Sequence, residues 1–359
     1  MLETIREYAL ERLEHSGEAN EMRRSHAEHF LALAEEAELH LFEADPEAWH
    51  ERLERELANL RAALDLLESM GEDELALRMA GALAEFWAVK GHLREGRPRL
   101  ERALADYERP TAVRAKALNR AANLALGAGD AATATLRAEE ALALNRALGL
   151  GWGTAESLLL LGGTVTSEGD FERGRQVLDE SVRLFDELGD EHNALEATRL
   201  LAGAYRGLGE LDLATALLED NLRRARALGD NKVEATTLEA LARYALDDGR
   251  VPDALPMLKR AYRINRDVGE DYRDRIIVCY FARVLAFQGK MPEAACILSS
   301  SEVLIEEIGV RPPWIVKMNE GTLSTVRAQL DDATFSEAWD QGMKLTADEA
   351  VALALESLE

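Results

Sequence analysis

The 359-residue sequence predicts an all-α fold, a right-handed α-solenoid of antiparallel helical hairpins. Three observations predict it. Strong helix formers (Ala, Leu, Glu and Arg) dominate the composition, and only 8 prolines occur. Glycines recur at a fixed spacing of 40 residues, and small residues recur in register between them. A helix-stop pattern repeated at this length is typical of a solenoid.

Two interleaved series of glycines mark the ends of the predicted helices. The members of one series stand 20 residues from the members of the other. Glycine directly after a helix adopts the left-handed conformation that ends the helix and satisfies its last carbonyl groups. The pattern therefore predicts a helix end every 20 residues. The first series is Gly149, Gly189, Gly229, Gly269 and Gly309, and the second is Gly129, Gly169, Gly209, Gly249 and Gly289.

The residues that follow these glycines are suited to begin a helix. An aspartate there accepts hydrogen bonds from the first backbone N–H groups, and proline fits the first turn. Within each hairpin, one small residue per helix marks the point where the two helices cross. The helix-starting residues are Asp130, Asp170, Asp190, Asp230, Pro252 and Pro292, and the crossing pairs are Ala122/Ala134, Gly162/Gly174, Ala202/Ala214, Ala242/Ala254 and Ala282/Ala294.

The same signals divide the chain into three segments. Residues 1–72 are expected to form an N-terminal helical capping segment, because solenoids need atypical ends. Residues 73–309 are expected to form six hairpins, the first of them out of phase, and residues 310–359 a C-terminal helical cap. The expected helices of the caps lie at 18–42, 47–70, 318–331, 333–342 and 346–358, with Thr346 capping the last, and the first hairpin spans about 73–109.

The hairpins resemble the tetratricopeptide repeat, whose pattern is W-x2-L-G-x2-Y … A-x3-F … P. The first half is met by Leu158-x2-Leu161-Gly162-x2-Val165 and the second by Ala214-x3-Leu218. The spacing here is 40 residues, against about 34 in the family, and the closing proline is absent. Longer helices than usual are therefore expected.

The two ends of the chain resemble STAND-type ATPase regulators of bacteria, including LuxR-like and SARP-like transcriptional activators. The resemblance rests on MLETIREYALERL with His26–Phe30, on Ala84–His92, and on Phe335–Trp339 with Ala347–Leu355. It implies the regulatory region of such a protein, either as a separate gene product or as a fragment. The sequence holds no G-x-x-x-x-G-K-[ST] loop for nucleotide phosphates and no helix-turn-helix after the repeats.

Charge and cysteine content narrow the classes of partner. The formal net charge of −25 repels nucleic-acid phosphates, so direct nucleic-acid binding is not expected. No stretch of about 18 apolar residues occurs, so no membrane span is expected. Two cysteines, Cys279 and Cys296, do not make a disulfide framework; they are expected to be buried thiols of a cytoplasmic protein.

No catalytic, metal or cofactor site is expected. His26 and His29 have a spacing at which two imidazoles can share a metal, but no third ligand has a matching position. The first helix of each hairpin lines the concave groove in the resembled family, and several of its groove positions hold arginine. Arginines there are suited to bind a carboxylate or phosphate, unless each pairs with an acidic neighbour such as Glu196 or Glu239. The predicted groove residues are Asn119, Asn123, Arg199, Arg206, Arg243 and Arg283.

The sequence thus predicts a non-enzymatic interaction module that binds a protein or peptide, with acidic groups, in a concave groove. The resemblance implies that binding is transmitted to an ATPase and a DNA-binding output. The alternative is a domain that senses a small-molecule effector in the same groove. A third hypothesis is an autoinhibitory clamp without an external ligand.

Overall fold

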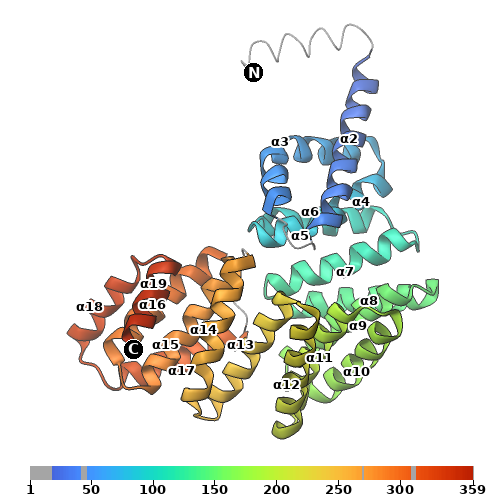
Figure 1. The fold of residues 1–359 in the computed structure, drawn as a ribbon. Coiled ribbons are helices and arrows are strands. Elements are labelled where there is room, and N and C mark those ends of the chain that lie inside the picture. Colours follow the sequence, from blue (N-terminus) through green and yellow to red (C-terminus); the bar gives the residue numbers. More distant parts are fainter. Residues whose placement is uncertain (1–17, 42–46, 269–270, 309–312, 359) are drawn as a thin grey trace, which may run out of the picture. The chain divides into compact units, whose positions relative to one another are not determined.

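The computed structural model describes residues 18–41, 47–268, 271–308 and 313–358, and every regular element in these ranges is an α-helix (Figure 1). The first segment quoted for the regulator resemblance, and Gly269 and Gly309, lie outside the described residues. The chain divides into two compact units, Met1–Ala121 and Ala122–Glu359. Each unit is described by itself.

The first unit begins with the two long helices that the sequence predicts. Helix α2 contacts α3 and α4, and α4 contacts α6. The predicted first helix of hairpin 73–109 is interrupted at Leu83, which separates α4 from α5. Trp87 of α5 is buried directly against Gly96 of α6, where an added methyl group would overlap the indole ring. The helices are α2 (Ala19–His40), α3 (Glu47–Met70), α4 (Asp73–Ala82), α5 (Ala84–Val89), α6 (Leu93–Asp106) and α7 (Ala112–Gly127), the last of which crosses into the second unit.

The second unit is a stack of helical hairpins with the predicted spacing. Each helix from α8 to α16 contacts the next, and the first helices of the hairpins also contact one another, α9 with α11, α11 with α13, and α13 with α15. The first helices therefore form one continuous layer. The helices are α8 (Ala131–Leu148), α9 (Gly151–Ser167), α10 (Phe171–Leu188), α11 (Glu191–Gly207), α12 (Leu211–Leu228), α13 (Asn231–Asp247), α14 (Val251–Val268), α15 (Asp271–Phe287) and α16 (Met291–Ile308).

The predicted helix ends are confirmed. The eight predicted glycines among the described residues, from Gly129 to Gly289, have φ between 67° and 92°. These angles require the left-handed region that glycine adopts without strain. The predicted aspartate caps are also in place: the side chains of Asp130, Asp170, Asp190 and Asp230 each accept a hydrogen bond from the backbone N–H three residues further on.

The predicted crossing points are the places of closest approach within the hairpins. A methyl group added at Gly162 of α9 would overlap Leu178 of α10, and one added at Gly174 of α10 would overlap Thr166 of α9. The corresponding alanines of the next two hairpins, Ala202 and Ala242, are fully buried. Small side chains at these positions therefore set the distance between the two helices of a hairpin.

The C-terminal helices α17 (Pro313–Arg327), α18 (Asp332–Gly342) and α19 (Ala347–Ser357) all contact α16. The prediction for α17, 318–331, was wrong at both ends. The helix begins at Pro313 because a proline in the first position lacks only an N–H that no helical carbonyl would accept. The prediction for α19 is confirmed, since Thr346 and Glu349 form a reciprocal capping box at its start.

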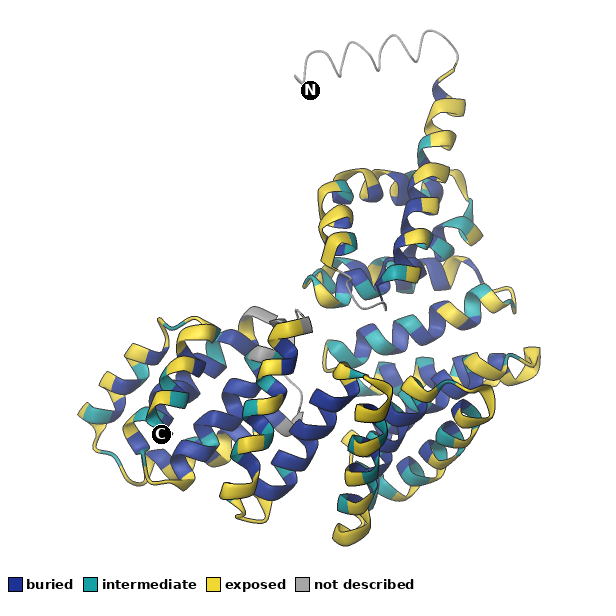
Figure 2. Cartoon of the chain, viewed as in Figure 1, coloured by how far each residue is buried: buried dark blue, intermediate teal, exposed yellow. Residues whose placement is uncertain are grey.

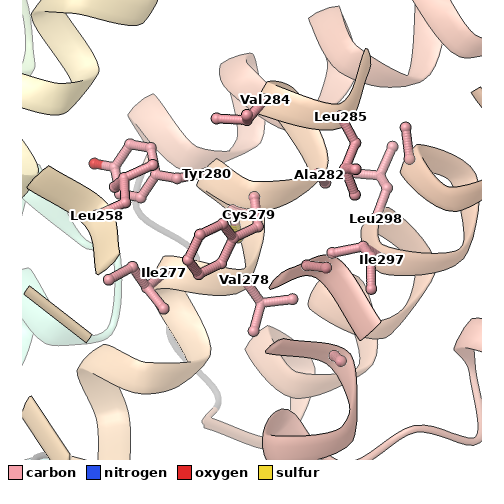
Figure 3. Packing of buried hydrophobic residues seen from close by; sticks show 14 of the residues in the cluster. Leu258, Ile277, Val278, Cys279, Tyr280, Ala282, Val284, Leu285, Ile297 and Leu298 are labelled. Carbon is pink, nitrogen blue, oxygen red and sulfur yellow. The ribbon is translucent and has the colours of Figure 1, made fainter. Parts of the chain in front are cut away.

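Burial is deepest in α13 and α15, whose side chains are covered along most of each helix (Figure 2). Their apolar residues join α14, α16 and the C-terminal helices in one core, part of which is seen around Cys279 and Tyr280 in Figure 3. Cys279 and Cys296 are both buried free thiols, as predicted. Desolvation raises the pKa of Cys279 to about 12, so this thiol stays protonated at neutral pH.

Candidate interaction surface on the stacked first helices

The four predicted arginines come from three first helices that lie in sequence within one layer. Arg199 and Arg206 belong to α11, Arg243 to α13 and Arg283 to α15, and all four are half-buried. Since α13 contacts both α11 and α15, side chains of three consecutive hairpins are brought to one surface. We call this surface the inner arginine surface.

The two predicted asparagines are placed differently. Asn119 is fully buried in the first unit, with 0% of its surface exposed, so its amide is not accessible to a partner. A polar side chain on a helix that is covered on most sides is a core residue rather than a groove residue, because it satisfies its hydrogen bonds inside the fold. Asn123 is half-buried and lies in the second unit, where its role stays a prediction.

The guanidinium group of Arg206 contacts three residues of the next hairpin. Its guanidinium lies over the ring of Tyr244, 4.2 Å from the ring centre, in the geometry of a cation–π contact. Its Nη2 donates to Oδ1 of Asp248 at 3.0 Å and lies 3.6 Å from Oδ2 of Asp247. Its Nη1 is buried and has no hydrogen-bond partner among the described residues. One strong donor of this arginine is thus unused.

Arg283 also contacts Asp247. Its Nη1 donates to Oδ1 of Asp247 at 2.7 Å, and its guanidinium lies 5.6 Å from the ring centre of Phe287, which is half exposed. The carboxylate of Asp247 therefore lies between an arginine of the preceding hairpin and an arginine of the following hairpin. We call Arg206, Asp247 and Arg283 the arginine clamp.

A second ionic cluster lies nearer the beginnings of the same helices. Arg199 donates to Glu196 at 2.8 Å, and the hydroxyl of Thr236 donates to the same carboxylate at 3.1 Å. Desolvation alone would raise the pKa of Glu196, but the charge and hydrogen bond of Arg199, together with the charge of Arg273, hold it at about 2. Glu196 is therefore ionised throughout the physiological range.

Glu239 forms the other half of this second cluster. It is almost fully buried and accepts hydrogen bonds from Arg273 at 2.8 Å and from Asn265 at 3.2 Å. A buried carboxylate needs such partners, because an unpaired charge in the interior is costly. Arg273 was not among the predicted residues, although it lies on the same layer as Arg283.

Tyr244 contacts Arg243 as well as Arg206. The guanidinium of Arg243 lies 5.2 Å from the ring centre of Tyr244, which is almost fully buried. Desolvation raises the pKa of Tyr244 despite the opposing charges of Arg243 and Arg206, so the phenol stays neutral. One buried ring therefore supports two arginine side chains, one on α11 and one on α13.

The predicted alternative, in which acidic neighbours neutralise the arginines, holds for most of the surface. Glu196 pairs with Arg199 as that alternative supposed, but Glu239 pairs with Arg273, and the clamp arginines pair with Asp247 and Asp248. These aspartates were missed. The available signal was opposite charge about one repeat apart, since Arg206–Asp248 is separated by 42 residues and Arg283–Asp247 by 36.

The residues that make these contacts are close to balanced in charge, although the chain carries a net charge of −25. An anionic group at these residues therefore meets less repulsion than the net charge alone would give. The residues that make up the balance are Arg199, Arg206, Arg243, Arg273 and Arg283 against Glu196, Glu239, Asp247 and Asp248.

The histidines considered for a metal site make ring contacts instead. The rings of His26 and His29 lie 4.7 Å and 5.0 Å from the ring of Phe30. In the described part of the chain, no three His, Cys, Asp or Glu side chains are grouped so that they could hold a metal ion. Across the same ranges, no helix combines the length and the apolar character needed to cross a membrane.

Comparison with known proteins agrees with the repeat pattern. Residues 194–267 match the tetratricopeptide repeat family. A 162-residue segment is 38% identical to proteins of Mycobacterium tuberculosis and Mycobacterium bovis that are named as HTH-type transcriptional regulators. The match covers 42% of this chain but only 18% of those proteins. The predicted resemblance to the repeats of bacterial regulators is thereby confirmed.

The solved structures that are similar over nearly the whole chain include two Rap proteins. A Rap protein complexed with Competence and Sporulation Factor has a TM-score of 0.60 at 12% identity, covering 94% of this chain and 99% of that one. The Rap conjugation gene regulator of plasmid pLS20, in complex with the Phr* peptide, has a TM-score of 0.50 at 10% identity, covering 92% and 98%. At these identities the similarity shows the helical-repeat fold.

Proposed function

We propose that this chain is a non-enzymatic interaction module that binds a protein or peptide segment on the inner arginine surface. The observation that carries the proposal is the convergence of Arg199, Arg206, Arg243 and Arg283 from three consecutive hairpins. The arginine side chains are already held by carboxylates or aromatic rings. Little side-chain entropy is then lost when a partner binds, which favours affinity.

The comparisons support a regulatory setting for this module. One similar structure contains a Phr* peptide, and the mycobacterial relatives are named as HTH-type transcriptional regulators. We propose further that the chain acts in the cytoplasm, as the regulatory region of a STAND-type signalling or transcription regulator. Within it, residues 73–309 would bind the partner, while residues 1–72 and 310–359 would cap the array.

A small-molecule effector bound at the same surface is the second candidate function. The observation that favours it is the buried Nη1 of Arg206, which has no hydrogen-bond partner among the described residues. A small anion reaches a recessed donor more easily than an extended chain does. Thermal-shift screening against a panel of metabolites tests this candidate, because a ligand bound only by the folded state raises the unfolding temperature.

Selection of peptides tests the leading proposal. A displayed library of random dodecapeptides is selected on the wild-type chain, and the affinities of the selected peptides are measured by fluorescence anisotropy. We expect Arg243→Glu and Arg283→Glu each to weaken binding at least about tenfold, because reversing a paired charge adds repulsion to the lost contact. The matched control is Arg223→Glu on the second helix α12, where the side chain is 77% exposed and pairs with Asp220 three residues away. Selected peptides that bind all three variants as tightly as wild type would show that the inner arginine surface is not the binding site.

A further inference from the structure

We infer that Asp247 is an internal stand-in for a carboxylate of the partner, which displaces it from between Arg206 and Arg283. This inference rests on the proposed function and names the class of partner: a peptide segment with acidic side chains. Asp247 then competes with the partner, because it occupies the two arginines until a ligand carboxylate that binds them more tightly displaces it.

The geometry of the clamp is that of a bound carboxylate. Oδ1 of Asp247 lies 2.7 Å from Nη1 of Arg283, and Oδ2 lies 3.6 Å from Nη2 of Arg206. The two oxygens thus face guanidinium groups from two different hairpins. Arginine recognises carboxylates through charge-assisted contacts, and a site in which guanidinium groups face both oxygens of Asp247 can accept those of a ligand carboxylate.

Asp247 is held by Arg283 but only weakly by Arg206. Its side chain is 36% exposed, and the 3.6 Å separation from Arg206 exceeds hydrogen-bonding distance. A partly exposed carboxylate that lacks a hydrogen bond from Arg206 is exchanged for a ligand at lower cost than a buried, fully paired one. A ligand carboxylate that also reached the unused Nη1 of Arg206 would gain a hydrogen bond that Asp247 does not make.

Contacts other than those with Asp247 also hold the clamp arginines. Arg206 donates a hydrogen bond to Asp248 at 3.0 Å and lies over the Tyr244 ring, and the guanidinium of Arg283 lies 5.6 Å from the ring centre of Phe287. Arg206 in particular is thus positioned by groups that a ligand carboxylate would not displace.

Helix stability does not account for an aspartate at this position. Asp247 is the last residue of α13, where the partial negative charge of the helix end disfavours another negative charge. The equivalent last residues of the neighbouring first helices are uncharged: Ser167 in α9, Gly207 in α11 and Phe287 in α15. The acidic residue occurs only in the hairpin that lies between the two clamp arginines, which points to a role in pairing with them.

The test compares wild type with Asp247→Asn, which keeps the size of the side chain and removes its charge. The probe is a fluorescent hexaglutamate peptide with an amidated C-terminus, with hexaglutamine as the uncharged reference, measured by anisotropy at low ionic strength. We expect the Kd for hexaglutamate to fall about tenfold in Asp247→Asn, and this gain to disappear in the double variant with Arg283→Gln. Asp220→Asn is the matched control, since Asp220 pairs with Arg223 on α12; it should leave the Kd unchanged.

An unchanged or higher Kd in Asp247→Asn overturns the inference, as does an equal gain in Asp220→Asn. Inorganic phosphate that displaces the probe at lower concentration than acetate does would overturn the carboxylate class. The melting temperature of each variant is measured first, and Asp247→Ser replaces Asp247→Asn if the latter does not fold. The proposed function is judged separately: library peptides that require Arg283 but ignore Asp247→Asn would support it while overturning this inference.

Discussion

Single residues decide how closely the hairpin helices approach, and Gly162 shows this most directly. Its backbone lies against Leu178, so even one added methyl group has no room. Protein interiors are packed at the density of organic crystals. A group added where no free volume exists therefore strains the neighbouring side chains or the backbone.

We therefore predict opposite effects of the same substitution at two helical glycines. Gly162→Ala should lower the free energy of unfolding by about 1–3 kcal/mol, because Leu178 must move. Gly321→Ala in α17 should raise it by about 0.5–1 kcal/mol, since a methyl group there meets no atom within 4 Å and the helix gains a better helix former. Urea denaturation followed by circular dichroism measures both. A gain in stability at Gly162 would contradict the packing described.

Features that depend on local backbone chemistry could be predicted from the sequence, whereas features that depend on the stacking of helices could not. Local backbone chemistry determines the glycine stops, the aspartate caps and the small crossing residues. Because these residues recur every 40 residues, they can be recognised in the sequence. The burial of Asn119 and the pairing of Asp247 depend on how neighbouring helices stack. Helical periodicity assigns a face to a residue, but it does not tell whether another helix covers that face or which acidic side chain reaches across.

At the scale of elements, successive first helices are joined by the residues that cap them. Asp190 caps α11 and also accepts a hydrogen bond from Trp152 of α9 at 2.8 Å. One repeat later, Asp230 caps α13 and lies 2.6 Å from Nδ1 of His192 of α11. The same carboxylate thus starts one helix and holds the beginning of the previous first helix.

The His192–Asp230 link predicts a pH dependence. The hydrogen bond to Asp230 raises the pKa of His192, and Glu196 adds to this while burial and Lys232 oppose it. The stabilisation by the charged imidazole is therefore complete below the unfolded pKa of about 6.5 and is lost as the pH rises through the folded value. The pKa of Asp230 is lowered because its hydrogen bonds outweigh desolvation, so its part is present above its unfolded pKa of about 3.9.

We expect His192→Gln to reduce the free energy of unfolding by less than about 1 kcal/mol between pH 4.5 and 6, because the imidazole is 46% exposed and screened by solvent. The difference from wild type should shrink as the pH is raised to 9. Equilibrium urea unfolding at a series of pH values measures it. A difference that grows with pH would mean that His192 acts in its neutral form.

At the scale of the whole molecule, the reactivity of the two cysteines measures the opening of the second unit. Both thiols of the chain, Cys279 and Cys296, lie in the second unit and are buried in its largest core. Desolvation raises the pKa of each, so reaction requires both exposure and deprotonation.

We predict that an aromatic disulfide reagent at pH 8 labels the native chain at least about a thousandfold more slowly than the chain unfolded in guanidinium, because labelling requires opening of the core. Absorbance of the released thiolate measures the rate. Destabilising variants of the second unit such as Gly162→Ala should accelerate labelling if α9 and α15 open together. Rapid labelling of the native wild type would contradict the burial of both thiols.

The register of caps, stops and crossing residues has a consequence for the length of the array. A unit such as 151–190 ends with a glycine stop and an aspartate cap for the next helix, so its duplication would add a hairpin in the same register. The arginine clamp has no such periodicity, because residues 206, 247 and 283 are drawn from three different hairpins. Lengthening before α11 would leave the clamp intact, whereas one hairpin inserted between α11 and α15 would separate its members. The protein therefore combines a segment of adjustable length with one of fixed length.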